Sequence, residues 1–258
     1  MASKSSKRVT RYRKNFLSKV ILRCDYDSIE LGKLEEFSKS QKNKFPFQEE
    51  QDVVNREMTI DFAKGEFISS REKGLKTWTF LSATRKKKFI ITPLFVAIEY
   101  VENSYINRDE LIDDFNEVIR PYLEFFNIVT INRLGLRYIN EISLNSIKTD
   151  FKWENYFNKE LLGGMNFTKK TKGELARAMS KTEFQFGSEK IVFQYGIWNR
   201  DYPNENTRKE FILDIDCFSR FPHESNDELR EAIQSYNQRA EAVFEKSITD
   251  AFRDFLKK

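Results

Sequence analysis

The residues best suited to chemistry in this sequence are two aspartates, Asp214 and Asp216, in the segment KEFILDIDCF. Apolar and polar residues alternate here, which predicts a β-strand with both carboxylates on one face. Two such carboxylates can hold Mg²⁺ for reactions at phosphate esters, and Glu183 or Asp61 is a candidate third oxygen ligand. The sequence therefore offers one candidate catalytic group, with Mg²⁺ as its cofactor.

A second polar pattern lies in residues 132–142, NRLGLRYINEI. On a strand, Arg133, Gly135 and Arg137 would share one face, and the alternate leucines would form the core face. If this strand lies beside the Asp-Ile-Asp strand, the arginines would face the aspartates in a charge ladder worth about 0.2–1 kcal/mol per pair. The functional alternative is a concave polar face that binds a phosphate or an acidic partner, with Asn140 as a further binding residue.

Three basic clusters could follow the phosphate backbone of a nucleic acid. The candidate binding residues in these clusters are Arg11 and Arg13 near the N-terminus, Arg85, Lys86, Lys87 and Lys88 in a predicted turn, and Lys169, Lys170 and Lys172 in a predicted loop. The structural alternative is that lysines in turns and loops keep the surface solvated and prevent edge-to-edge aggregation.

The net charge of +4 comes from the start of the chain. Residues 1–14 contain six of the 44 basic residues and no acidic residue, so residues 15–258 carry about −2. We therefore expect a basic, disordered arm over 1–14 on a near-neutral body. A globally basic nucleic-acid-binding domain is not supported.

Other familiar chemistries lack their residues. His223 is the sole histidine, and the two cysteines, Cys24 and Cys217, lie in strand patterns, so Ser-His-Asp and Cys-His catalysis and a His/Cys zinc site are disfavoured. There is no dinucleotide-binding fingerprint and no P-loop. No apolar run approaches the ~20 residues that span a bilayer. We expect a cytoplasmic protein with reduced cysteines and no membrane partner.

The elements that must position these residues follow from hydrophobic periodicity. Alternating segments predict strands at 19–26, 53–62, 75–83, 88–101, 129–144, 174–186, 190–198 and 209–218. Apolar residues at three-to-four spacing predict helices at 29–40, 107–126, 151–161 and 226–256. Strands outnumber helices and most are hairpin-linked, which predicts an α+β fold with a largely antiparallel sheet and helices on one face.

Proline and capping residues refine these elements. Pro93 predicts an edge position or a bulge in its strand, and Pro121 predicts a kink or a restart of its helix. Asn107 and Ser225, each followed three residues later by glutamate, predict the N-caps of two helices.

The order of the elements suggests an internal repeat. Both capped helices follow three strands and begin with Asp-Glu-Leu, so the single domain 15–258 is expected to contain two related β-β-β-α halves, 15–148 and 149–258. The long C-terminal helix is expected to pack across the sheet. In the alternative, it exposes an apolar stripe to a partner helix.

The run Arg-Leu-Gly-Leu-Arg-Tyr-Ile-Asn at 133–140 resembles the signature of a sporadically distributed family of prokaryotic proteins of about this length. The early strand at 20–26, the LDID of 213–216 and the closing helix are similar too. No activity is assigned to that family, so the resemblance implies no catalytic residues. Its patchy distribution resembles that of mobile-element and anti-phage defence genes.

These observations favour a non-enzymatic accessory or regulatory protein that contacts another protein or a nucleic acid, in the setting of a prokaryotic defence or mobile-element system. The alternative is the Mg²⁺-dependent enzyme acting through Asp214 and Asp216. The two differ in a structural expectation. An enzyme needs the aspartates clustered with a third acid, whereas the binding protein leaves them paired with Arg133 and Arg137.

Overall fold

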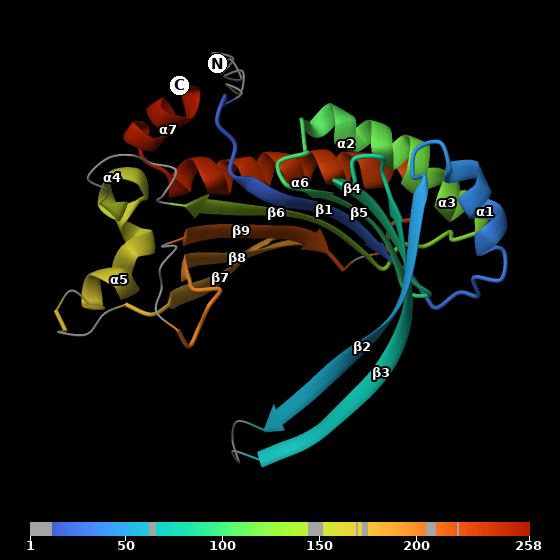
Figure 1. Cartoon of the computed structure of the whole chain (residues 1–258), viewed down its shortest axis with the longest axis horizontal. Coiled ribbons are helices and arrows are strands. Elements are labelled where there is room, and N and C mark those ends of the chain that lie inside the picture. Colours follow the sequence, from blue (N-terminus) through green and yellow to red (C-terminus); the bar gives the residue numbers. More distant parts are fainter. Residues whose placement is uncertain are drawn as a thin grey trace.

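The computed structural model describes residues 12–61, 66–143, 152–168, 170–171, 175–204, 210–220 and 222–258. Its centre is a nine-stranded sheet, antiparallel at every pairing, with the order β2-β3-β4-β5-β1-β6-β9-β8-β7. The predicted α+β fold with an antiparallel sheet is confirmed (Figure 1).

The strands are β1 (Leu17–Asp25), β2 (Phe47–Asp61), β3 (Glu66–Leu81), β4 (Lys87–Ile91), β5 (Phe95–Val101), β6 (Arg133–Ser143), β7 (Ala178–Phe186), β8 (Glu189–Trp198) and β9 (Glu210–Ser219). The helical segments are α1 (Leu34–Gln41), α2 (Arg108–Asp114), the π-helical turn η1 (Phe115–Ile119), α3 (Arg120–Phe125), α4 (Trp153–Tyr156), the 3₁₀ turn η3 (Lys159–Leu162), α5 (Gly163–Thr168), α6 (Asn226–Ser247) and α7 (Asp250–Lys257).

Helices α2, α3 and α6 lie across one face of the sheet (Figure 1). Alternate residues of the central strands, such as Leu22 of β1 and Leu136 of β6, point to this face and are fully buried. An aromatic cluster joins the helices to the sheet, with Phe37, Phe89 and Tyr122 within ring-contact distance of one another. The hydrophobic core therefore lies between the sheet and these helices, and the opposite face is covered by no helix of the described chain.

The strands β2 and β3 form a two-stranded ribbon at one edge. β3 pairs with β4 only through Trp78–Leu81, although β3 pairs with β2 along its length. The rest of the ribbon leaves the sheet and projects past the uncovered face (Figure 1). The ribbon therefore borders the uncovered face at this edge of the sheet.

The strand order outward from the central β1–β6 pair is similar on the two sides. One side runs β1, β5, β4, β3 and the other runs β6, β9, β8, β7, and the first side carries β2 as an additional edge strand. Both sides end in a capped helix: the Asn107 side chain accepts a hydrogen bond from the Glu110 amide, and the Ser225 side chain accepts one from the Glu228 amide. This match favours an internal duplication in which β6 opens the second half, so that the boundary precedes β6. The duplication itself stays a prediction.

Two predicted elements are divided in the structure. The strand expected at 88–101 is a hairpin, β4 and β5, and Pro93 lies in its turn rather than at an edge or bulge. Proline has no N–H for a sheet ladder, and a turn leaves that donor unneeded. The C-terminal helix ends at Ser247, because Ile248 is extended and forms a β-bridge with Phe157.

The N-terminal arm was expected to end at residue 14, but its last residues belong to the folded body. The amides of Arg13 and Lys14 donate to the Leu256 carbonyl at 2.9 and 3.0 Å. The Tyr12 hydroxyl donates to Glu245. Residues 1–11 lie outside the described chain. Among the helices that the structure describes, none is long and apolar enough to cross a membrane.

Candidate functional site: the uncovered face of the sheet

The uncovered face gathers charged side chains from the central strands. Strand register places Arg137 of β6 opposite Asp216 of β9 and opposite Ile21 of β1. Because residues directly opposite one another share a face, the odd-numbered residues of β1 and β6 and the even-numbered residues of β9 all point to the uncovered side. The two sequence patterns singled out for chemistry therefore meet at the middle of the sheet.

A ladder of ion pairs runs across these strands. The Arg137 guanidinium donates two bonds to Asp214, at 2.8 Å to Oδ1 and 2.6 Å to Oδ2. Arg133 donates to Asp216 at 3.1 Å and reaches Asp25 of β1 at 3.5 Å. The predicted pairing of the arginines with the two aspartates is confirmed. It extends one strand further than predicted, because Arg133 also reaches Asp25 of β1, which in turn accepts from Arg23 at 2.8 Å.

A second set of pairs continues the pattern on the other side of β1. Glu99 of β5 accepts from Lys19 of β1 and from Lys88 of β4, each at 3.2 Å. One carboxylate is thus shared by two ammonium groups. Together these ion pairs are distributed over five neighbouring strands, β4, β5, β1, β6 and β9.

Most cations of this ladder reach further into solvent than the anions beside them, and the exception is the pair Arg133 and Asp216, each 24% exposed. The side chains of Glu99 and Asp214 are 10% and 11% exposed, whereas those of Lys19 and Arg137 are 37% and 39% exposed. Long basic side chains lie over short acidic ones and hold their charged ends in water. A molecule approaching this face meets guanidinium and ammonium groups first, although the carboxylates beneath them balance most of their positive charge.

Gly135 has a specific role within this arrangement. A Cβ built at Gly135 would lie 2.6 Å from Nη1 of Arg133 and 3.0 Å from Cζ. The Arg133 side chain therefore folds over the glycine, and its guanidinium lies 4.6 Å from the ring centre of Phe218. The space that the missing side chain of Gly135 leaves on this face is occupied by Arg133.

This geometry removes the support for a metal site at Asp214 and Asp216. Both carboxylates are engaged by arginines, and Glu183 lies two strands away on β7, in register with Asp216 through Val192. Two strand spacings separate the backbones by roughly 10 Å, too far for a shared ligand sphere. Within the described chain, no group of three His, Cys, Asp or Glu residues could hold a metal ion.

Burial raises the pKa of Asp216, and Arg133 and Arg137 only partly offset that effect. The bidentate bond to Asp214 raises the pKa of Arg137. The arginine is therefore held in its charged form. The pKa of Asp216 is raised because its side chain lies below the surface, where the ionised form loses hydration.

The cluster Arg85 to Lys88 is divided between the two faces of the sheet. Lys87 points to the helices, where its ammonium contacts Glu110 at 2.9 Å and Asp114 at 2.6 Å. Lys88 points to the uncovered face and belongs to the ladder. The other two cations also lie near carboxylates, Arg85 at 3.2 Å from Glu49 and Lys86 at 3.5 Å from Glu102. These residues do not form one basic surface.

The remaining candidate binding residues lie away from the ladder. Asn140 faces the helices, is buried, and its amide lies 3.4 Å from the Leu213 carbonyl. Lys170 is exposed beyond α5, and Arg13 is exposed beside α7. Arg11, Lys169 and Lys172 lie outside the described residues.

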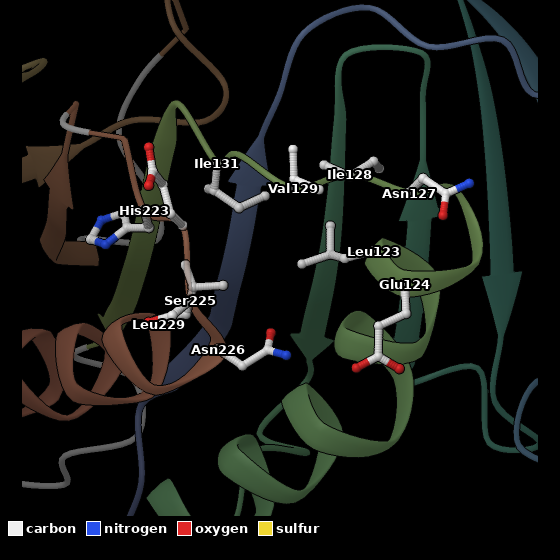
Figure 2. A pocket seen from close by; sticks show the side chains of 11 residues that line it. Leu123, Glu124, Asn127, Ile128, Val129, Ile131, His223, Ser225, Asn226 and Leu229 are labelled. Atoms are coloured by element: carbon white, nitrogen blue, oxygen red, sulfur yellow. The ribbon is translucent and has the colours of Figure 1, made fainter.

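A separate cavity of about 340 Å³ lies on the helix side, between the end of α3 and the start of α6. Its lining includes Leu123, Ile131 and Leu229, and Figure 2 shows the ring of His223 pointing away from Leu123. The His223 ring shares a hydrogen bond of 2.7 Å with the Ser219 hydroxyl, and burial lowers its pKa. His223 thus contributes a structural hydrogen bond just before the N-terminus of α6.

Four members of the ladder were not predicted from the sequence, namely Lys19, Arg23, Asp25 and Glu99. The alternation in KVILRCD, with Lys19, Ile21, Arg23 and Asp25 on one face, is the same signal that identified Arg133 and Arg137. The pairing of β1 with β6 could not be predicted from the sequence.

Comparisons of the chain with models of protein families, with curated proteins and with solved structures found no match.

Proposed function

We propose that this chain is a non-enzymatic binding protein whose uncovered sheet face receives an acidic surface of another protein. The observation that carries the proposal is the layered ladder, in which partly exposed cations such as Arg23, Lys19 and Arg137 lie over recessed carboxylates. Acidic groups of a partner could accept from the outer faces of these cations while the inner pairs persist.

A protein partner fits this face better than a nucleic acid does. Nucleic-acid affinity comes from neutralising phosphates with cations that are otherwise free, and it is lost steeply as salt rises. Here Lys88 and Arg133, like the exposed cations, each have a carboxylate within 4 Å. A phosphate backbone carries negative charge alone and would also meet the underlying carboxylates, whereas an acidic protein surface can place its carboxylates at the cations and neutral groups opposite the recessed carboxylates.

The scaffold alternative has lost its support. The apolar residues of α6 that were expected to form a partner stripe, including Leu229, Ile233, Tyr236 and Ala240, are buried against the sheet. The proposed partner therefore belongs on the opposite side. A role in a defence or mobile-element system remains a prediction from the family resemblance.

A direct test compares defined probes on designed variants. Lys19→Gln with Arg23→Gln removes two exposed cations, and it leaves Glu99 with Lys88 and Asp25 with Arg133. The control, Lys33→Gln with Lys39→Gln, makes the same charge change on exposed residues of α1 and its N-cap. Fluorescence anisotropy then measures binding of a Glu/Asp-rich peptide, single- and double-stranded DNA, and RNA over a salt series.

We expect the acidic peptide to bind the wild-type chain and the α1 control. The face variant should bind it at least fivefold more weakly, because two charged contacts are lost. A third variant, with the basic residues of 1–11 changed to Gln, separates the contribution of the tail. The proposal is wrong if the peptide binds equally to all variants, if it does not bind, or if DNA or RNA binds the face more tightly than the peptide.

A further inference from the structure

The last strand of the sheet, β7, has one edge without a partner in the described chain. β7 pairs with β8 through all nine of its residues, and its other edge ends the sheet. Seven of those nine residues are exposed, including the apolar side chains Met179, Phe184 and Phe186. An open edge offers a row of N–H and C=O groups to any second strand, and exposed apolar residues favour such pairing.

We propose that β7 pairs antiparallel with β7 of a second copy of this chain, about a two-fold axis at Thr182. In a two-fold pair, each contact occurs twice, so the strand must be complementary to its own reverse. With Thr182 at the centre, position 181 lies opposite 183, position 180 opposite 184, and position 178 opposite 186. The sequence AMSKTEFQF meets this requirement in charge and in size.

The charges match across the axis. Lys181 lies opposite Glu183 of the second copy, and Glu183 opposite Lys181, on the same face of the joined sheet. Within one chain, the two side chains already contact each other at 2.6 Å, and they remain 56% and 59% exposed. Directly opposed charges of opposite sign stabilise an antiparallel pair, and opposed like charges destabilise it.

The sizes match on the other face. Phe184 lies opposite Ser180, and Phe186 opposite Ala178, so that each large ring meets a small side chain. Phe184 and Phe186 are 38% and 43% exposed, and the guanidinium of Arg239 lies 4.5 Å from the ring centre of Phe186. The second strand would cover the solvent-facing sides of these rings.

This pairing would join two sheets into one continuous sheet. Because opposed residues share a face, the uncovered faces of both copies would lie on the same side. The dimer would therefore present two copies of the charge ladder side by side to a partner. The inference rests on the β7 edge alone and does not depend on the proposed function of the ladder.

Charge reversal provides a test with internal controls. Lys181→Glu places Glu opposite Glu at both symmetric contacts, and Glu183→Lys places Lys opposite Lys. The double variant with both changes restores opposite charges with the order exchanged. Both positions are exposed, so each variant is expected to fold. Sedimentation velocity over a concentration series on the full chain gives the dimer dissociation constant of each.

We expect the wild type and the double variant to dimerise with similar dissociation constants, and each single variant to dimerise roughly tenfold or more weakly. Mixing the two single variants should restore association, because each supplies the charges that the other lacks. The inference is overturned if the wild type is monomeric throughout the series, or if its dimer is insensitive to the single reversals. It is also overturned if the mixture does not associate better than either single variant.

Discussion

The bond between Arg137 and Asp214 should be among the stronger polar contributions to the stability of this protein. It is bidentate, with donor–acceptor distances of 2.8 and 2.6 Å, and Asp214 is only 11% exposed. Hydrogen bonds to charged groups contribute about 1.5–3 kcal/mol each when buried. The Arg137 side chain is 39% exposed, so water can replace part of the lost contact and the lower end of that range applies.

A double-mutant cycle with Asp214→Asn and Arg137→Met isolates the pair. We expect Asp214→Asn to lower the free energy of unfolding by about 1.5–2 kcal/mol and the coupling energy to be about 1–1.5 kcal/mol. Urea unfolding measures both, provided that the slope against denaturant is unchanged. The matched control is the pair Lys39–Glu35 on α1, which is 74% and 86% exposed and should couple by about 0.3–0.5 kcal/mol.

A coupling energy for Arg137–Asp214 no larger than that of the α1 pair would refute the reasoning. It would mean that the carboxylate is solvated in solution and that the ladder is not a fixed feature of the face.

Three further predictions concern other parts of the fold. Gly196→Ala should destabilise by roughly 3 kcal/mol or more, measured by thermal unfolding, because its φ is +135° and an added Cβ would lie 2.0 Å from the Ala178 carbonyl oxygen. Cys24 and Cys217 are buried and burial raises the pKa of both thiols, that of Cys217 to about 12, so a thiol reagent at pH 8 should label neither until urea unfolds the chain. Because the pKa of Asp216 is raised in the folded state, ionisation of Asp216 lowers the free energy of unfolding as pH rises above about 4. The free energy of unfolding of Asp216→Asn, relative to that of wild type, should therefore be higher at pH 7 than at pH 3.5.

The sequence was most informative where periodicity and capping carry the structure. Alternation in NRLGLRYINEI separated the buried leucines from the arginines, and the caps at Asn107 and Ser225 form as predicted. These features are local, since strand pleat and helix N-termini depend on residues a few positions apart. The pairing of the arginines with the aspartates could also be predicted, because only a face carrying both charges leaves neither unpaired.

Features that depend on distant contacts were harder to predict. Ile248 fits a helical pattern, but its bridge to Phe157 ends α6, which a local pattern does not encode. The cluster of 85–88 looked like one basic surface, yet the pleat of β4 sends Lys87 and Lys88 to opposite faces, toward carboxylates of α2 and β5. Which strand neighbours which decided the role of each lysine.

The central claim, that the uncovered face receives another protein, is tested most directly by crosslinking in the cells that make this chain. A photo-reactive residue replaces Ile139, which lies on the uncovered face between Lys19 and Asp214 in the strand register. The control position is Glu36, an exposed residue of α1. We predict a single prominent protein adduct from position 139, absent from position 36 and strongly reduced by Lys19→Gln with Arg23→Gln. Nucleic-acid adducts at position 139, equal adducts from both positions, or none from either would contradict the claim.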